Sequence, residues 1–292
     1  MSMRVVDLLH YGVTQLESAD IEQAALEVEL LLGVCLEKNR AGLFLAATDE
    51  VGERQEQQFL SFLARRVKYE PSAYILGEKE FWSLPFHVTP DVLIPRPETE
   101  FLLETVLALT NNQRWQPGPV LDLCSGSGVI AIVLALELGR SVTAVDISAS
   151  ALQVARQNAI RHQVADRLSL VQADLFNAFV PRPLFSLVVS NPPYVSRQEL
   201  QEGLQPEVMR YEPHLALDGG VDGLDIIQRI RTGLPRVLKP GGYFFMEIGA
   251  DQGLAVWQLF TGDDADEKIF DRVEVLQDYS GRDRVLQVRM AT

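Results

Sequence analysis

The sequence of 292 residues has few cysteines, no long apolar run and no excess of basic residues. Its 2 cysteines, Cys35 and Cys124, are too few for a disulfide framework or a multi-cysteine metal site, and its 4 histidines are scattered. The longest apolar run, Val129–Leu136, is far shorter than the ~20 residues of a membrane-spanning helix. Met1–Leu9 shows no small-residue cleavage pattern, so we expect no secretory signal. These absences predict a cytoplasmic protein without a bound metal.

The charge of the chain is strongly acidic, because 26 Lys and Arg stand against 40 Asp and Glu, for a net charge of −14. Nonspecific binding to nucleic acid depends on basic side chains that neutralise phosphates, so the composition gives such binding no support. An acidic surface can instead steer a basic protein partner, and it also keeps an enzyme in solution. The length and an apolar fraction of 47% are typical of a globular protein with one large or two ordinary domains.

Residues 1–77 show the apolar spacing of helices. The stretches are Val5–Val13, Ile21–Leu32, Asn39–Ala47 and Glu53–Lys68. Because apolar residues recur there at helical intervals, we predict a small helical bundle over this region. Arg65, Arg66 and Lys68 are typical of a solvated helix end, and contact with a partner is the alternative.

The pattern then changes to short β-like pieces. They are Phe81–Trp82, Phe86–Val88 and Val92–Ile94, separated by Pro85 and Pro90. We interpret 78–95 as a β-hairpin that links two domains. A helix is predicted from Pro97 or Glu98, because proline is tolerated in the first turn of a helix.

From Val120 onward, strand-like and helix-like stretches alternate. The predicted strands are Val120–Leu123, Val142–Val145, Leu168–Val171, Leu184–Val189, Tyr243–Ile248, Arg272–Leu276 and Val285–Arg289. The predicted helices are Val129–Leu138, Ala149–His162, Leu224–Leu238 and Gln252–Phe260. This alternation indicates an α/β fold in which helices cover both faces of a mostly parallel sheet. The short turn Tyr279–Asp283 requires the last two strands to pair antiparallel.

A glycine-rich loop, Cys124–Gly128, follows the first of these strands and precedes a helix. Glycine permits positive φ and close approach to a ligand, and open α/β sheets bind ligands at the carboxyl ends of their strands. A tight turn that only packs the helix on the strand is the alternative. Asp146, at the end of the second strand, can bond ribose hydroxyls, and Asp174 follows the third, so together they favour a bound nucleoside. Asp122 is predicted to hold the loop through backbone hydrogen bonds.

The segment Asn191-Pro192-Pro193-Tyr194 follows a buried strand and is the most informative in the sequence. Consecutive prolines fix φ and restrict the residue before them, so this turn is stiff. Neither proline has an N–H, which leaves the Pro192 carbonyl as a directed acceptor beside the side-chain oxygen of Asn191. Two such acceptors can take both hydrogens of one planar amide or amino NH2 group, on which Tyr194 can stack. A rigid turn without a ligand is the alternative.

With this segment, the loop and Asp146, the chain resembles class I S-adenosylmethionine-dependent methyltransferases that act on exocyclic or amide nitrogen. More narrowly, it resembles the release factor glutamine methyltransferase family. The motifs that carry the resemblance are Tyr74–Gly77, Val92–Glu100, Asp122–Gly128, Ala144–Ser148, Ser190–Tyr194, Tyr211–Pro213, Gly219–Leu224, Leu238–Gly242, Glu247–Gly249 and Gly281–Arg284. Each motif is modest alone, but their order and spacing together are highly specific.

The resemblance implies a Rossmann-like seven-stranded sheet with an antiparallel last strand in a methyltransferase domain over 96–292. It also implies that the helical domain over 1–77 recognises the substrate, which would be the Gln of the Gly-Gly-Gln motif in bacterial peptide chain release factors. The implied S-adenosylmethionine site comprises Cys124, Ser125, Gly126, Ser127, Gly128, Asp146 at the ribose, Asp174 and Leu175 at the adenine, and Asn191. The implied catalytic and substrate-binding clamp comprises Asn191, Pro192, Pro193 and Tyr194.

This chain departs from many members of the family at two places. Those members have Gly-Thr where this chain has Cys124-Ser125, and we expect little change because the side chains stay small. They also have an aromatic residue at the position of Leu175, which offers adenine an apolar contact without ring stacking.

Two other functions stay open on the sequence. An N6-adenine nucleic-acid methyltransferase would use a similar clamp, because adenine also presents an NH2 group, but such an enzyme needs a basic groove and a way to hold an extruded base. A non-catalytic module could retain the cofactor fold. Pro95–Thr99 is either interdomain structure or active-site lining, and Glu247 is interpreted as a structural residue near the site.

Overall fold

A computed structural model describes residues 3–111, 115–262 and 269–292 of the chain. Contacts between Cα atoms divide the chain into two units. The first, called here the helical unit, comprises 1–78 and 205–211. The second, the sheet unit, comprises 79–204 and 212–292.

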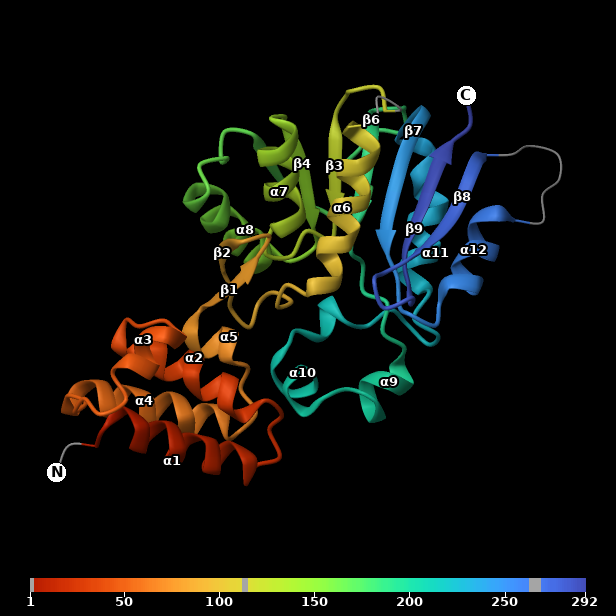
Figure 1. Cartoon of the computed structure of the whole chain (residues 1–292). Helices are drawn as coiled ribbons and strands as arrows, with labels where there is room; N and C mark the ends of the chain where they lie inside the picture. Colours follow the sequence, from red (N-terminus) through yellow and green to blue (C-terminus); the bar gives the residue numbers. More distant parts are fainter. Residues whose placement is uncertain (1–2, 112–114, 263–268) are drawn as a thin grey trace. The chain divides into compact units, whose positions relative to one another are not determined.

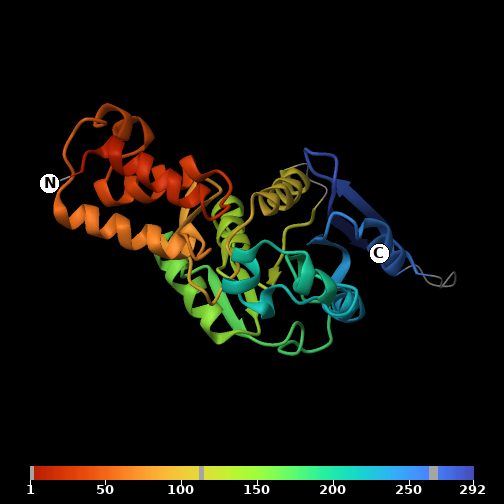
Figure 2. The same cartoon turned by 90° about the horizontal axis from the view of Figure 1, so that it is seen from below.

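The helical unit is a bundle in which α1, α2 and α4 lie side by side (Figures 1 and 2). Its first helices are α1 (Val5–Glu17), α2 (Ala24–Leu36), α3 (Arg40–Leu45), α4 (Glu53–Arg66) and α5 (Ser72–Leu76). Leu8, Val28 and Phe59 are fully buried in its core. Gly12 allows α1 to approach α2 closely, since a Cβ there would lie 2.8 Å from Cγ1 of Val28. The predicted helical bundle is confirmed.

A segment distant in sequence completes the helical unit. This segment holds α10 (Pro206–Tyr211), whose Glu207 forms an ion pair of 2.7 Å with Arg66 of α4. Arg66 also pairs with Glu27 at 3.1 Å and is only 4% exposed. The interpretation of Arg66 as part of a solvated helix end is therefore wrong, because two carboxylates compensate its burial. This ion pair holds α10 against the bundle. Residues 205–211 therefore belong to the helical unit, although they lie inside the predicted domain 96–292.

The sheet unit is built on one seven-stranded sheet in the order β5-β4-β3-β6-β7-β9-β8. Figure 1 labels the strands of this sheet from β4 to β8. Its strands are β3 (Val120–Leu123), β4 (Val142–Asp146), β5 (Leu168–Gln172), β6 (Phe185–Ser190), β7 (Leu238–Glu247), β8 (Phe270–Gln277) and β9 (Asp283–Met290). Neighbouring strands are parallel except that β9 runs antiparallel to both β7 and β8. This topology confirms the predicted Rossmann-like α/β fold with an antiparallel last strand.

Helices cover both faces of this sheet (Figure 1). They are α6 (Pro97–Asn111), α7 (Val129–Leu138) and α8 (Ala149–Arg161) on one face, with α11 (Asp225–Gly233) and α12 (Gly253–Thr261) on the other. Successive strand residues alternate between the faces, so Val120 packs with the first group and Leu121 with the second. The alternation places one apolar core on each side of the sheet.

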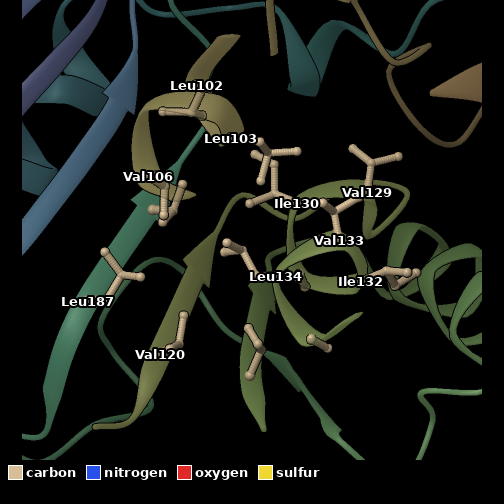
Figure 3. Packing of buried hydrophobic residues seen from close by; sticks show 14 of the residues in the cluster. Leu102, Leu103, Val106, Val120, Val129, Ile130, Ile132, Val133, Leu134 and Leu187 are labelled. Carbon is tan, nitrogen blue, oxygen red and sulfur yellow. The ribbon is translucent and has the colours of Figure 1, made fainter. Parts of the chain in front are cut away.

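The central helix α7 explains the longest apolar run in the sequence. Figure 3 shows Ile130, Val133 and Leu134 of this helix in one cluster with Leu103 of α6 and Val120 of β3. Because α7 is enclosed by the sheet and by α6 and α8, it is apolar all round rather than amphipathic. No helix in the described part of the chain has both the length and the apolarity to cross a membrane.

The structure differs from the sequence prediction in the proposed linker. The hairpin consists of β1 (Glu78–Phe81) and β2 (Leu84–His87), whereas Val92–Ile94 forms no strand. Most of 78–95 belongs to the sheet unit rather than standing between two domains. The physical reason is Asn158 of α8, whose side chain accepts from the His87 N–H at 2.7 Å and donates to the His87 carbonyl at 2.9 Å.

The helix predicted over Leu224–Leu238 is shorter in the structure. It ends at Gly233, and a 3-10 turn over Leu234–Arg236 follows it. Proline in that turn has no N–H to continue the helix, and Leu238 already pairs with β6 as the start of β7. The short helices α9 (Arg197–Glu202) and α10 have no counterpart in the sequence prediction.

Candidate active site

Strand register brings the ends of three strands to one edge of the sheet. Leu123 at the end of β3 pairs with Val145 of β4 and with Ser190 of β6. The glycine-rich loop, Asp146 and Asn191 follow these residues, so they leave the sheet side by side. The chain crosses here from one side of β3 to the other, which is where open α/β sheets bind ligands.

The glycine-rich loop depends on left-handed backbone conformations. Cys124, Gly126 and Gly128 have φ values of 59°, 52° and 82°. A Cβ on Gly126 would meet no atom within 4 Å, whereas one on Gly128 would lie 3.0 Å from that of Ala155. Gly126 therefore provides an open backbone surface, and Gly128 provides close packing of α7 on α8. The left-handed conformation costs Cys124 roughly 1–2 kcal/mol, whereas glycine adopts it freely.

Burial raises the pKa of the Cys124 thiol. The thiol therefore stays protonated at neutral pH, where a nucleophilic cysteine would need to be a thiolate. A protonated thiol fits the expectation that a small side chain here changes little in the loop.

Asp146 links the loop to the second strand. Its Oδ2 accepts a hydrogen bond of 2.8 Å from the Gly126 N–H, and its Oδ1 accepts one of 2.9 Å from the Ser148 N–H. Burial raises the pKa of this carboxyl, against the effect of these backbone donors. Each carboxylate oxygen keeps a second lone pair, so Asp146 can still accept hydrogen bonds from two hydroxyls of a ligand.

The predicted role of Asp122 in holding the loop rests on its backbone carbonyl, which accepts from Oγ of Ser125 at 3.3 Å, and not on its carboxyl. Neither carboxyl oxygen accepts a hydrogen bond from any residue in the described part of the chain, although the side chain is fully buried. The reason is that the Gly126 N–H is bonded to Asp146 and the Ser125 N–H to the Val145 carbonyl. Burial raises the pKa of Asp122 to about 8, so the carboxyl is mainly protonated at neutral pH.

This shift predicts how stability depends on pH. Between pH 3.8 and about 8, the folded state keeps the Asp122 proton that the unfolded state releases. The free energy of unfolding should therefore fall as pH rises through this range, by as much as about 5 kcal/mol from this group. Asp122→Asn removes the titration, so its unfolding free energy should fall less over the same range. Urea denaturation of both proteins at the two ends of the range measures the difference, and equal slopes would contradict the assignment.

The Asn191–Tyr194 segment sits in a hydrogen-bond network. Pro192 is buried, and the half-buried Asn191 donates from Nδ2 to Oγ1 of Thr99 at 3.2 Å. The Tyr194 hydroxyl donates to Oε1 of Glu247 at 3.1 Å, and burial raises the pKa of this phenol. Stacking of Tyr194 on a substrate stays a prediction, because its hydroxyl is committed to Glu247.

A cavity of about 530 Å³ lies at this edge, within the sheet unit. The predicted site residues that line it are Cys124, Ser125, Gly126, Ser127, Asp146, Asp174, Leu175, Asn191 and Pro193. Gly128, Pro192 and Tyr194 are not among its lining residues. One cavity thus contains most of the predicted nucleoside site together with Asn191 and Pro193 of the predicted amide clamp.

Other lining residues were missed or left open on the sequence. Pro95, Arg96 and Thr99 line the cavity, as does 213–216. Glu212 ties these two walls together, because its carboxylate accepts from the Ile94 N–H at 3.2 Å and pairs with Arg96 at 2.5 Å. The segment Pro95–Thr99 is therefore part of the site lining. In the sequence, only the family motif Tyr211–Pro213 marked the region of residues 213–216. Its residue types did not by themselves indicate a binding site.

Asp174, predicted at the adenine side, pairs with Arg229 at 2.6 Å, and both residues line the cavity. The sequence analysis did not predict Arg229 as a site residue. No sequence pattern indicates that it lies beside Asp174, which is 55 positions away. The carboxylate of Asp174 is thus partly compensated before any ligand binds.

Comparison with known proteins identifies the family. Residues 7–77 match the PrmC N-terminal domain, and residues 97–221 match the methyltransferase small domain. The chain is 41% identical over 290 residues to the release factor glutamine methyltransferase of Cereibacter sphaeroides, with 99% of both chains covered. The chain belongs to the release factor glutamine methyltransferase family. A second member, from Koribacter versatilis, is 46% identical over 242 residues, which cover 82% of this chain and 84% of that one.

Solved structures support the fold of this release factor glutamine methyltransferase family member. The 16S rRNA N2 G1207 methyltransferase of T. thermophilus superimposes with a TM-score of 0.53 at 18% identity, over 73% of this chain and 49% of that one. A methyltransferase from Pyrococcus furiosus gives a TM-score of 0.51 at 17% identity, over 73% and 92%. At such identities the likeness concerns the fold alone. The resemblance read from the motifs is confirmed by the family, and the protein is a methyltransferase.

Proposed function

We propose that this protein transfers a methyl group from S-adenosylmethionine to the side-chain amide nitrogen of the Gln in the Gly-Gly-Gln motif of peptide chain release factors. The observation that carries the proposal is the placement of Asn191 in the same cavity as Gly126 and Asp146. The names of the relatives support release factors as the partner.

The residues of the cavity fit S-adenosylmethionine. Asp146 retains free lone pairs for the ribose hydroxyls, and the open surface at Gly126 admits close approach of a ligand to the backbone. Leu175 and Ile147 supply apolar contact for a flat base, and Asp174 stands beside them in the wall. S-adenosylmethionine supplies a methyl carbon that its sulfonium already makes electrophilic.

The remaining difficulty of the reaction is the nucleophile, because the nitrogen of a carboxamide is delocalised into its carbonyl. Asn191 Oδ1 and the Pro192 carbonyl would accept the two N–H hydrogens of the substrate amide. Their dipoles raise electron density on nitrogen, fix its approach and stabilise the positive charge that develops during transfer. Orientation of this kind contributes at most about 7–11 kcal/mol. The proton can leave to water after the methyl group has been transferred.

The test is mass spectrometry of a purified release factor after incubation with this protein and S-adenosylmethionine. We expect one added methyl group on the Gln of the Gly-Gly-Gln motif. A release factor with Glu in place of that Gln is the control and should gain none, because a carboxylate has no N–H to donate to the two acceptors.

Two results would contradict the proposal. The first is an unmethylated Gln although calorimetry shows that the cofactor binds. The second is transfer of the methyl group to adenine in added DNA or RNA, which would favour the N6-adenine alternative. The net charge of −14 argues against that outcome, since such a substrate needs a basic groove.

The compartment follows from the same proposal. Both cysteines, Cys35 and Cys124, are free thiols. Free thiols fit a reducing compartment such as the cytoplasm, where translation termination takes place.

A further inference from the structure

A fourth strand brings a buried carboxylate to the site. Ser190 of β6 pairs with Met246 of β7, so Glu247, the last residue of β7, lies level with Asn191. Glu247 is 1% exposed. Thr99, in the first turn of α6, is 2% exposed and lies between them. The proposed mechanism uses neither Thr99 nor Glu247.

The hydrogen bonds between these side chains run in one direction. Thr99 Oγ1 lies 2.6 Å from Oε2 of Glu247, and Asn191 Nδ2 lies 3.2 Å from the same Oγ1. A hydroxyl has one hydrogen, and an ionised carboxylate has none to give. While Glu247 is ionised, the form that its two hydroxyl donors and Arg284 favour, Thr99 donates to it and can only accept from its other neighbour.

This proton count decides how the Asn191 amide is turned. The group that faces Thr99 must be the donating NH2, so the oxygen Oδ1 points to the other side of the amide plane. No hydrogen bond within the described residues engages Oδ1. Resting on the proposed function, we propose that Thr99 and Glu247 are positioning residues that hold Asn191 with its oxygen, and not its nitrogen, available to the substrate amide.

The chemistry of Glu247 suits this role better than simple packing. Its second oxygen accepts from the Tyr194 hydroxyl, so both oxygens are engaged by hydroxyl donors. Burial raises the pKa of Glu247, while these two donors and Arg284 favour its charged form. A buried carboxylate costs desolvation energy that an apolar residue of similar volume would avoid. If Glu247 served only to fill space, an apolar side chain would do so without this desolvation energy.

The test asks whether Thr99 orients the Asn191 amide or only packs against it. The measured quantity is the preference of each variant for the Gln or the Glu form of a release factor. Thr99→Val keeps the shape of the side chain and removes the hydroxyl, and Thr99→Ser restores the hydroxyl. Thr105→Val is the matched control on the same helix, because the one partner of the Thr105 hydroxyl among the described residues is the Phe101 carbonyl of that helix. The probes are a release factor with its Gly-Gly-Gln motif and the same factor with Glu in place of Gln, used as a competitive inhibitor.

We expect Thr99→Val to lower kcat by about 10- to 100-fold with cofactor affinity unchanged, because small misplacements of a positioned group have effects of this size. An unfixed Asn191 can also turn its NH2 toward the ligand, and a carboxylate prefers a donor. The Glu form should therefore compete better against the Gln form by about tenfold. Thr99→Ser and Thr105→Val should retain the kcat and the preference of the wild type.

A second variant guards against a loss of folding in Thr99→Val. Glu247→Gln has one acceptor oxygen for two hydroxyls, so it should shift the same preference toward the Glu form. Thermal unfolding of each variant shows whether it is folded.

The outcomes distinguish this proposal from the proposed function. A wild-type protein that fails to methylate the release factor would reject both. Normal methylation by the wild type, with kcat and ligand preference unchanged in folded Thr99→Val and Glu247→Gln, would reject the positioning role alone. Equal loss of activity in Thr99→Ser and Thr99→Val, without a shift in ligand preference, would also reject it and indicate packing.

Discussion

Asn191→Ala is expected to lower the kcat of glutamine methylation by about 10²- to 10³-fold. Asn191 lies in the cavity wall, and its Oδ1 has no partner among the described residues, so alanine removes an acceptor that is already in place. A preorganised dipole of this kind acts mainly on the transition state, where positive charge develops on the substrate nitrogen. Single-turnover kinetics with a release factor would measure the effect on the chemical step.

The affinity for S-adenosylmethionine and the melting temperature of Asn191→Ala should stay close to those of the wild type. Within the residues that the structure describes, the side chain makes a single hydrogen bond, to Thr99, and it is only half-buried. Asn177→Ala, at an exposed asparagine of the sheet unit, is the control and should methylate normally. Near-normal turnover by purified Asn191→Ala would remove Asn191 from the mechanism.

Asp146→Ala is expected to weaken S-adenosylmethionine binding by at least about 100-fold. Hydrogen bonds to a charged group contribute about 1.5–3 kcal/mol each, and this carboxylate can accept two from a ribose. The substitution also leaves the N–H groups of Gly126 and Ser148 without their acceptor, which loosens the loop that faces the ligand. Asp146→Asn keeps one acceptor oxygen, so its affinity should lie between those of Asp146→Ala and the wild type.

Isothermal titration calorimetry with S-adenosylmethionine measures these affinities directly. Asp166→Ala, at an exposed aspartate after α8, should bind the cofactor as the wild type does. At saturating cofactor, Asp146→Ala should recover a large part of its turnover, because Asp146 does not contact the reacting amide in the proposed mechanism. Unchanged affinity in Asp146→Ala would reject the ribose role.

The elements that carry the site could be predicted because local signals specify them. Alternating apolar runs predicted the strands, and the glycines at 126 and 128 predicted a loop with positive φ, which the structure confirms. Such signals depend only on residues within a few positions of one another. Errors arose where a local pattern was ambiguous, as at Val92–Ile94, or where a tertiary partner changed the environment, as at Arg66.

Asp122 shows a second reason why a local pattern can fail to predict the contacts of a side chain. An acidic residue before a glycine loop reads as a loop support, but two other acceptors already hold the loop N–H groups. Only the register of β3 on β4 reveals that competition, because it brings Asp146 and Val145 next to the loop.

Composition, motifs and periodicity were sufficient for the fold class, the family and the place of the cofactor loop, since each of these leaves its mark within short segments of chain. The contacts that complete the site join residues far apart in sequence: Thr99 meets Glu247 across 148 positions and Asn191 across 92. Glu212 likewise reaches Ile94 across 118 positions. Strand order and register decide which distant residues meet, and those are set by the packing of the whole sheet. The direction in which Asn191 turns its amide was therefore decided by the tertiary structure alone.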